Sequence, residues 1–164
     1  MISMNHIHNH FPFTKIVVVC SVNTARSRMS EGYLRDFFSR NAMDVSVSSG
    51  GIASNARDGM LISLDAKLVM KEIGIPLSDD SLSIDLKKHP ESAQEADLIL
   101  TLTNKHKKEI FDHLKLENKR IFTLREFAGE TGDIEDPSMK GVEGFRKARD
   151  EIINCIDKGM KKYE

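Results

Sequence analysis

The most constraining feature of this sequence is an apolar run at residues 15–20, with a helical pattern close behind it. The run reads Lys-Ile-Val-Val-Val-Cys, and its continuous β-branched character is typical of a strand buried on both faces. Residues 27–40 then place Met29, Tyr33 and Phe37 at the spacing of an amphipathic helix. A strand followed directly by a helix is the first half of a βαβ unit, which predicts a parallel sheet.

The same alternation of strands and helices continues along the chain. Further strands are expected at 45–48, 96–102 and 120–124, and further helices at 60–73, 86–95, 104–113 and 141–162. In the helix expected at 60–73, the residues on or near one face are Leu61, Leu64, Leu68 and Ile73. Right-handed crossovers then predict one three-layer α/β domain over residues 15–164, with a four-stranded parallel sheet in the order 2-1-3-4 and helices on both faces.

The segment before the first strand carries His6, His8 and His10 at alternate positions. Alternating histidines can bind a metal, but no ordered ligands are expected near them. We therefore interpret residues 1–14 as a flexible N-terminal tail, and we expect no metal site.

Composition excludes several classes of function. The formal net charge of −1 predicts no nucleic-acid surface and no basic membrane-binding patch. The longest apolar run, 16–20, is too short to span a bilayer, and the N-terminus does not resemble a signal peptide. Two cysteines, Cys20 and Cys155, do not form a disulfide framework, which favours a cytoplasmic protein with reduced thiols.

The loop after the first strand is where residue type and spacing predict chemistry. In the expected strand order, ligands bind beyond the end of the central first strand, where Cys20 lies. The five loop residues between Cys20 and Arg26 are Ser21, Val22, Asn23, Thr24 and Ala25. Their backbone N–H groups have no helical partner and can bind a phosphate-like anion. Asn23 tolerates the left-handed backbone that such a loop needs.

Side chains at the two ends of this loop add a nucleophile and a clamp. A helix N-terminus and a nearby arginine stabilise a thiolate at Cys20. Arg26 can hold two phosphoryl oxygens, and Ser27 can donate a hydrogen bond to the thiolate. The alternative is a cysteine that simply ends a core strand beside a solvated arginine, but the whole combination favours a catalytic phosphate site.

The motif Cys20-x5-Arg26-Ser27 resembles the low-molecular-weight protein tyrosine phosphatase family. The segments 49–52, 96–100 and 136–137 are similar to other parts of that family, so the resemblance covers nearly the whole chain after residue 14. It implies a flavodoxin-like, phosphotyrosine phosphatase I-like fold and hydrolysis through a phosphocysteine on Cys20, with no metal or cofactor. The implied partners are a phosphorylated protein and a phosphate or other oxyanion in the loop, without nucleic acid or membrane. The expected assembly is a monomer or weak dimer.

The leaving group of such a reaction needs a proton, and only a short tail precedes Cys20, so the acid must lie downstream. Its candidates in the loop 129–140 are Glu130, Asp133, Glu135 and Asp136. Pro137 holds Asp136 in extended backbone, and the resemblance implies that Asp136 is the general acid. If Asp-Pro is only a turn, Asp133 is the substitute.

Three residues bear on the substrate. Thr24 resembles the protein arginine phosphatase branch, whereas tyrosine-specific relatives usually carry a bulky aliphatic residue there. A threonine hydroxyl can accept a hydrogen bond from a guanidinium group. Ser138 and Met139 stand where many relatives place an aromatic wall. We expect phosphotyrosine as the family default, with phosphoarginine as the alternative.

Two other functions fit the same loop less well. An arsenate reductase needs resolving cysteines, but Ala25 stands inside the loop and no cysteine lies between Cys20 and Cys155, which we expect in the core. A non-catalytic phosphate-binding module would need no thiol. We interpret the remaining histidines as surface residues: His89, His106 and His113.

Overall fold

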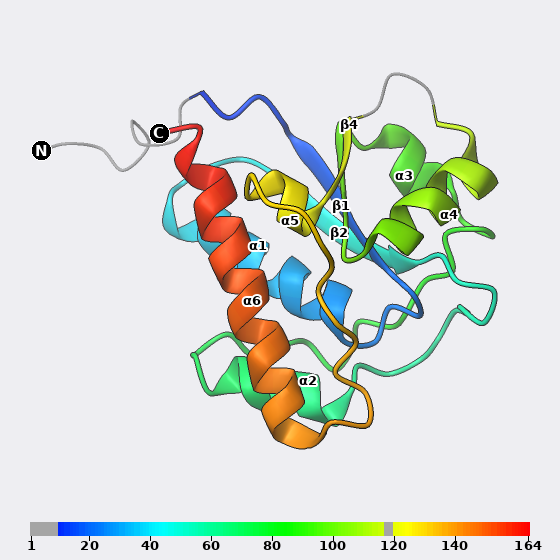
Figure 1. Ribbon diagram of the computed structural model, residues 1–164, viewed down its shortest axis with the longest axis vertical. Coiled ribbons are helices and arrows are strands. Elements are labelled where there is room, and N and C mark those ends of the chain that lie inside the picture. The colour runs from blue at the N-terminus through cyan, green and yellow to red at the C-terminus, as the bar shows by residue number, and fades with distance from the viewer. Residues whose placement is uncertain (1–9, 117–119) are drawn as a thin grey trace, which may run out of the picture.

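The computed structural model describes residues 10–116 and 120–164 of the chain. At its centre is a parallel sheet in the order β2-β1-β3-β4, which confirms the expected topology (Figure 1). The strands are β1 (Lys15–Cys20), β2 (Ser46–Gly51), β3 (Leu98–Thr101) and β4 (Arg120–Thr123). β1 pairs with β2 on one side and β3 on the other, so the end of β1 lies in the middle of the sheet edge.

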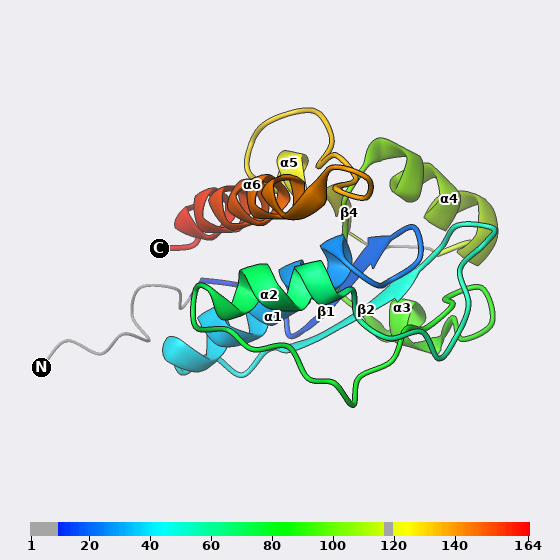
Figure 2. The same cartoon turned by 90° about the horizontal axis from the view of Figure 1, so that it is seen from below.

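Helices cover both faces of the sheet, as Figures 1 and 2 show. Their bounds are α1 (Arg26–Arg40), α2 (Leu64–Lys71), α3 (Glu91–Glu95), α4 (Asn104–Leu114), α5 (Leu124–Phe127) and α6 (Gly141–Lys161). α6 packs against α1, α2 and α5 on one face, and α3 and α4 lie on the other. None of the helices in the described ranges is both long and apolar enough to cross a membrane.

Side chains of β1 alternate between the two faces of the sheet. Ile16, Val18 and Cys20 belong to the core cluster under α1 and α6, whereas Val17 and Val19 belong to the cluster under α3 and α4. All five are buried, as expected for a central parallel strand. Cys20 therefore points to the face that α1 covers.

The helix expected at 60–73 is shorter than the sequence predicted. α2 begins at Leu64, because the side chain of Ser63 accepts a hydrogen bond from Ala66 N and caps the first turn. The helix buries Ala66, Val69 and Met70 instead of its leucines. The side chains left exposed are Leu61, Leu64, Leu68 and Ile73.

Other boundaries also differ from the expectation. The helix expected at 86–95 is reduced to α3, because Asp85 bridges to Gly51 and its carbonyl accepts from Lys88 N and His89 N in a turn. α5 was not expected. It follows β4 directly, where Thr123 and Glu126 form a capping box.

Residues 1–9 of the expected tail lie outside the described residues. Beyond that point, Phe13 is buried and the ring of Phe11 packs against Phe38 and Tyr163. These contacts join the segment just before β1 to the core beneath α1 and α6.

Candidate active site

Cys20 lies at the carboxyl end of β1, where the chain turns into α1. Its side chain is only 3% exposed. The sulfur lies 2.9 Å from Ser27 Oγ, and Asn23 N donates to it over 3.3 Å. The sulfur therefore lies within hydrogen-bond distance of one backbone N–H group and one hydroxyl group of its own loop and helix.

Asn23 holds the loop in shape. Its φ of 64° lies in the left-handed region, as the sequence predicted for this position. Its buried side-chain amide donates to Ser27 Oγ at 2.8 Å and to Ser49 Oγ at 2.9 Å. The amide oxygen accepts from Ile84 N at 3.0 Å, so this one side chain connects the loop, α1, β2 and the segment after residue 80.

The loop also rests closely on β2. Ile52 N donates to the carbonyl of Ser21, and a Cβ at Gly51 would lie 2.8 Å from that same carbonyl oxygen. Only glycine therefore allows this approach. The N–H groups of Val22, Thr24 and Ala25 donate to no acceptor within the described residues, so they remain available for an anion.

Arg26 begins α1 and is buried despite its charge, with 6% of its surface exposed. Its Nη1 donates to the carbonyl of Ile134 at 2.7 Å, which ties the first loop to the segment 129–140. Its Nη2 lies 4.0 Å from Asp136 Oδ2. A buried guanidinium held from one side keeps its other N–H groups free for a ligand.

Asp136 is the carboxylate that the structure brings to Arg26. Partial burial raises its pKa, but hydrogen bonds from Ser138 and the charge of Arg26 outweigh this effect, so the pKa lies below its usual value. Ser138 N donates to Asp136 Oδ1 at 2.9 Å. The side chain remains 58% exposed, facing the solvent from which a substrate would enter.

Asp133, the substitute acid, has a different partner. Its Oδ1 accepts from the backbone N of Asn104 at 2.8 Å, at the start of α4. It thus satisfies an unpaired N–H of a helix N-terminus. No ion pair joins it to Arg26 in the described part of the chain, in contrast to Asp136.

The residues expected to select the substrate lie around this opening. Thr24 is half-buried, and its carbonyl accepts from Ser63 N just before α2. Ser138 and Met139 are exposed beyond Pro137, and Met139 is fully exposed with a φ of 71°. No aromatic residue occurs at 21–25 or at 136–139, so neither segment supplies an aromatic wall.

His106 was expected at the surface, and that prediction is wrong. The side chain is 2% exposed, and its Nε2 lies 2.8 Å from Ser21 Oγ. Burial, reinforced by the charge of Arg26, lowers the pKa of His106 to about 4, so the ring is neutral at pH 7. The signal was in the topology: α4 follows β3, the neighbour of β1, so its first turn shares the sheet edge with Cys20.

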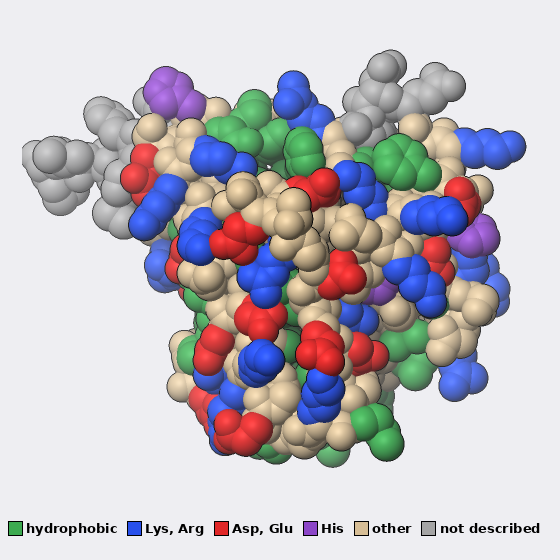
Figure 3. All heavy atoms as spheres, viewed as in Figure 1, with side chains coloured by type: hydrophobic (Ala, Val, Ile, Leu, Met, Phe, Trp, Pro, Cys, Tyr) green, Lys and Arg blue, Asp and Glu red, His purple; other side chains and the backbone are tan. Residues whose placement is uncertain are grey.

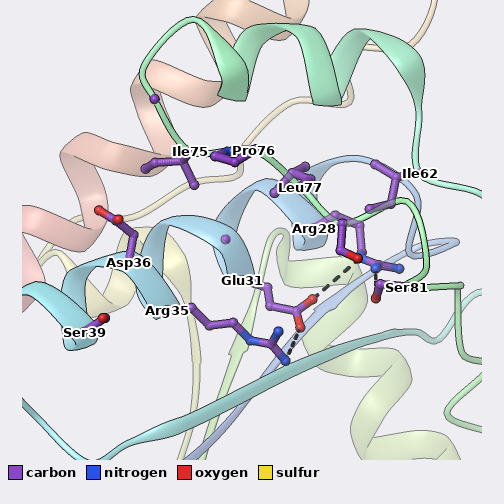
Figure 4. A pocket seen from close by; sticks show the side chains of 13 residues that line it. Arg28, Glu31, Arg35, Asp36, Ser39, Ile62, Ile75, Pro76, Leu77 and Ser81 are labelled. Carbon is purple, nitrogen blue, oxygen red and sulfur yellow. Dashed lines mark hydrogen bonds and ion pairs between the residues drawn. The ribbon is translucent and has the colours of Figure 1, made fainter.

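A network of charged side chains behind the loop was also not predicted from the sequence. Ser49 Oγ donates to Glu31 at 2.5 Å, and Glu31 is paired with Arg28 at 3.5 Å and with Arg35 at 2.9 Å. Figure 4 shows Arg28, Glu31 and Arg35 at a hollow of about 360 Å³, where Arg28 also contacts Ser81. Hydrogen bonds therefore connect Cys20 to Glu31 in one series, through Ser27, Asn23 and Ser49.

Cys155 lies on α6 and is completely buried, as expected. Burial raises the pKa of its thiol, and Arg125 Nη1 lies 3.5 Å from the sulfur. Both cysteines are free thiols. The structure thus holds one thiol among donors at the sheet edge and a second in the core.

Together these groups form a site for nucleophilic attack on a tetrahedral oxyanion. It combines a thiol, unpaired backbone N–H groups, a buried guanidinium and an exposed carboxylate. Such groups can stabilise charge on phosphoryl oxygens while the sulfur attacks phosphorus.

Comparison with known proteins agrees with this geometry. The sequence pattern of the family "Low molecular weight phosphotyrosine protein phosphatase" matches residues 15–163. A protein-arginine-phosphatase of Geobacillus stearothermophilus is 34% identical over 151 residues, covering 92% of this chain and 96% of that protein.

Two solved structures are similarly close. The low-molecular-weight protein tyrosine phosphatase of T. tengcongensis superposes with a TM-score of 0.82 at 32% identity, over 91% of this chain and 99% of that one. A mutant of the YwlE arginine phosphatase with a phosphorylated active-site serine has a TM-score of 0.82 at 28% identity, over 91% of this chain and 95% of that one. Sequence pattern, relatives and fold agree, and this chain belongs to the low-molecular-weight phosphotyrosine protein phosphatase family.

Proposed function

We propose that this protein hydrolyses phosphorylated residues of other proteins through a phosphocysteine on Cys20. One observation carries the proposal: Cys20 Sγ accepts from Asn23 N and contacts Ser27 Oγ, in a loop that opens toward Arg26 and Asp136. A binding module would need the N–H groups and the arginine, but it would gain nothing from a thiolate.

In the first step, the sulfur of Cys20 attacks phosphorus and the bond from phosphorus to the leaving oxygen or nitrogen breaks. Asp136 gives its proton to that leaving atom. The free N–H groups of Val22, Thr24 and Ala25, together with Arg26, stabilise charge on the three equatorial oxygens.

The lowered pKa of Asp136 describes the site without a substrate, in which Arg26 is its nearest charge. A phosphoryl dianion in the loop would engage Arg26 and bring negative charge toward the carboxylate. Both changes raise the pKa of Asp136, so substrate binding itself supplies the protonated acid.

In the second step, Asp136 is ionised and takes a proton from water as that water attacks phosphorus. The bond from sulfur to phosphorus then breaks, which releases phosphate and restores the thiolate, and Ser27 Oγ eases this departure. The related YwlE structure with a phosphorylated active-site serine supports a covalent phospho-enzyme at this position of the fold.

For the substrate, we propose phosphotyrosine, as the description of the family indicates. Phosphoarginine is a second candidate, and specific observations favour it. Thr24 and Ser138 carry hydroxyl groups and their segments supply no aromatic wall, and a relative at 34% identity is a protein-arginine-phosphatase. Stacking would favour a tyrosine ring, whereas hydroxyl acceptors would favour a guanidinium.

We place this activity in the cytoplasm, because Cys20 must remain a reduced thiol to act and both cysteines are free. We propose a monomer or weak dimer as the working form. Cell fractionation and sedimentation at micromolar concentration test these two points.

The reaction is tested with a simple aryl phosphate and purified protein. Cys20→Ser is expected to abolish turnover, because a serine hydroxyl is far less ionised than a thiol at neutral pH. The matched control is Cys155→Ser, which removes the core thiol and should leave turnover per folded molecule unchanged. If the wild type binds phosphate but turns over no aryl phosphate, the protein is a binding module.

The substrate is tested by comparing kcat/KM for phosphotyrosine and phosphoarginine peptides of the same sequence. Thr24→Ile is expected to shift the ratio toward phosphotyrosine by about tenfold or more, because it removes a hydroxyl acceptor and adds an apolar wall. Thr24→Ser is the matched control, since it keeps the hydroxyl. An unchanged ratio in Thr24→Ile excludes Thr24 as the selecting residue.

A further inference from the structure

Some of the large hydrophobic side chains that are exposed to solvent belong to segments that touch the catalytic loop. Eight occur in the described part of the chain: Leu61, Leu64, Leu68, Ile73, Leu82, Ile84, Phe111 and Met139. Leu61 and Leu64 flank Ser63, which hydrogen bonds to the loop, and Ile84 hydrogen bonds to it directly. Figure 3 shows small areas of hydrophobic surface at the lower edge of the molecule, on a face that is otherwise mostly charged.

Four of these residues lie on two segments that are hydrogen bonded to each other, and we call them the apolar rim: Leu61, Leu64, Leu82 and Ile84. The backbone holds its two halves together, because Ser83 N donates to Met60 O and Met60 N donates to Ser83 Oγ. Leu61 and Leu64 are 70% and 77% exposed, more than Leu68 on the next turn of α2.

The apolar rim is joined directly to the catalytic loop at two points. Ser63 N, between the two leucines, donates to the carbonyl of Thr24 at 2.9 Å. Ile84 N donates to the side-chain oxygen of Asn23 at 3.0 Å. The rim therefore borders the loop that would hold the phosphoryl group, and it shares that loop's rigidity.

A shallow hollow of about 360 Å³ lies within this rim, lined by Leu61, Ile62, Leu64, Lys67 and Asp79. Lys67 and Asp79 pair with each other, so the hollow presents no unpaired charge of its own. It is large enough for one aliphatic or aromatic side chain. Figures 1 and 2 both place the start of α2, the turn before α6 and the β1–α1 loop at the same end of the molecule.

A protein substrate with its phosphorylated residue in the catalytic loop has to continue across this surface. An extended chain advances about 3.3 Å per residue, so side chains two to four residues from the phosphorylated one lie about 7–13 Å along the chain from it. We propose that the apolar rim binds an apolar side chain of the substrate polypeptide two to four residues from the phosphorylated residue. This inference rests on the proposed phosphatase function and adds a preference for flanking sequence.

The test uses phosphopeptides that differ at one position. Each carries the phosphorylated residue in a glycine–serine sequence, with a single leucine placed in turn at positions −4 to +4. Leucine at one or two of these positions is expected to raise kcat/KM about tenfold over the peptide without leucine, which corresponds to burial of part of one side chain. Leu64→Ser and Leu61→Ser are expected to remove most of that gain.

Two controls separate docking from catalysis and folding. Turnover of a small aryl phosphate, which cannot reach the rim, should be the same in Leu64→Ser, Leu61→Ser and wild type. Phe111→Ser, which removes an exposed ring from α4, should retain the full preference for leucine.

Three results would overturn the inference. If leucine gives no gain at any position while the wild type still hydrolyses the peptides, the proposed function stands without this preference. If Leu64→Ser keeps the gain, the contact lies elsewhere. If sedimentation shows a dimer that Leu64→Ser dissociates, the rim belongs to an interface with a second copy of the chain. Failure to hydrolyse any phosphoester would instead refute the proposed function.

Discussion

The segment from Cys20 to Arg26 is mostly shielded from solvent and is held by several elements, whereas the segment that carries Asp136 is anchored by a few contacts and is exposed from residue 138 onward. The side chain of Asn23 hydrogen bonds to three separate parts of the structure: α1, β2 and Ile84. In the second segment, Ile134 is buried and bonded to Leu102 and Arg26. From residue 138 onward that segment lies in solvent.

This difference corresponds to two tasks. A phosphate cradle gains from N–H groups that are fixed before the ligand arrives, because no free energy is then lost in ordering them. A proton donor has to reach leaving groups of different shape, so it gains from an open position beside a fixed anchor. Substitutions can test whether the first segment depends on its fixed shape and the second on the access of its carboxylate to the leaving group.

The largest effect is expected at the open segment. Asp136→Asn removes the proton donor and should lower kcat on a phosphopeptide by about 10²- to 10⁴-fold. The loss should be smaller for an aryl phosphate with a strongly acidic phenol, because that leaving group needs less protonation. Steady-state kinetics with both substrates measures this.

The matched control is Asp133→Asn. An asparagine oxygen can still accept from Asn104 N, so kcat should change by less than about threefold. Equal losses for the two variants would show that the segment acts as a whole, and that the distinction between anchor and acid is mistaken.

A smaller effect is expected at the rigid segment. Asn23→Ala removes three hydrogen bonds and puts alanine at a φ of 64°, so the free energy of unfolding should fall by about 2–4 kcal/mol. Because the loop loses its fixed shape, kcat/KM should fall by about 10²-fold. Urea unfolding and kinetics at 25 °C measure the two losses.

Asn23→Gly separates the two causes, since glycine adopts this backbone without strain but lacks the amide. It should recover part of the stability and little of the activity. If it recovers both fully, the hydrogen bonds of Asn23 contribute nothing, and the rigid loop depends on backbone shape alone.

The smallest effect concerns His106 beside the rigid loop. Its pKa in the folded protein is about 4, below the usual value of 6.5, so the unfolded chain takes up the proton first as pH falls. Stability is therefore lost between about pH 6.5 and pH 4. From pH 7 to pH 5 the loss attributable to His106 should be about 2 kcal/mol.

His106→Gln should remove this part of the pH dependence, which urea unfolding at pH 7 and pH 5 would show. His89→Gln is the control, because His89 is exposed and pairs with Asp58. That variant should keep the loss of stability between pH 7 and pH 5. If His106→Gln still loses the same free energy of unfolding between pH 7 and pH 5, another buried group titrates. The loop is then not stabilised by a neutral imidazole.

Much of the fold followed from short patterns. The β-branched run at 15–20 predicted the central strand, and the alternation of strands and helices predicted the order 2-1-3-4. The positive φ of Asn23 also followed, because few residue types tolerate it. These features depend on local chemistry, which the sequence displays directly.

Features that depend on tertiary contacts could not be predicted from these patterns. The leucines around α2 have helical spacing, but spacing does not say which face meets the core, and here Ala66, Val69 and Met70 do. His106 lies in a charged helical stretch, yet the crossover from β3 brings it under Ser21. In both cases the partner comes from a distant part of the chain.

Because the two thiols have different surroundings, a reagent can modify one of them selectively. Cys155 is enclosed by the core, and its raised pKa keeps it protonated at neutral pH. Cys20 instead faces a pocket built for anions. A negatively charged alkylating reagent such as iodoacetate would thus be drawn to Cys20, and the number of labels per chain would count the intact sites in a preparation.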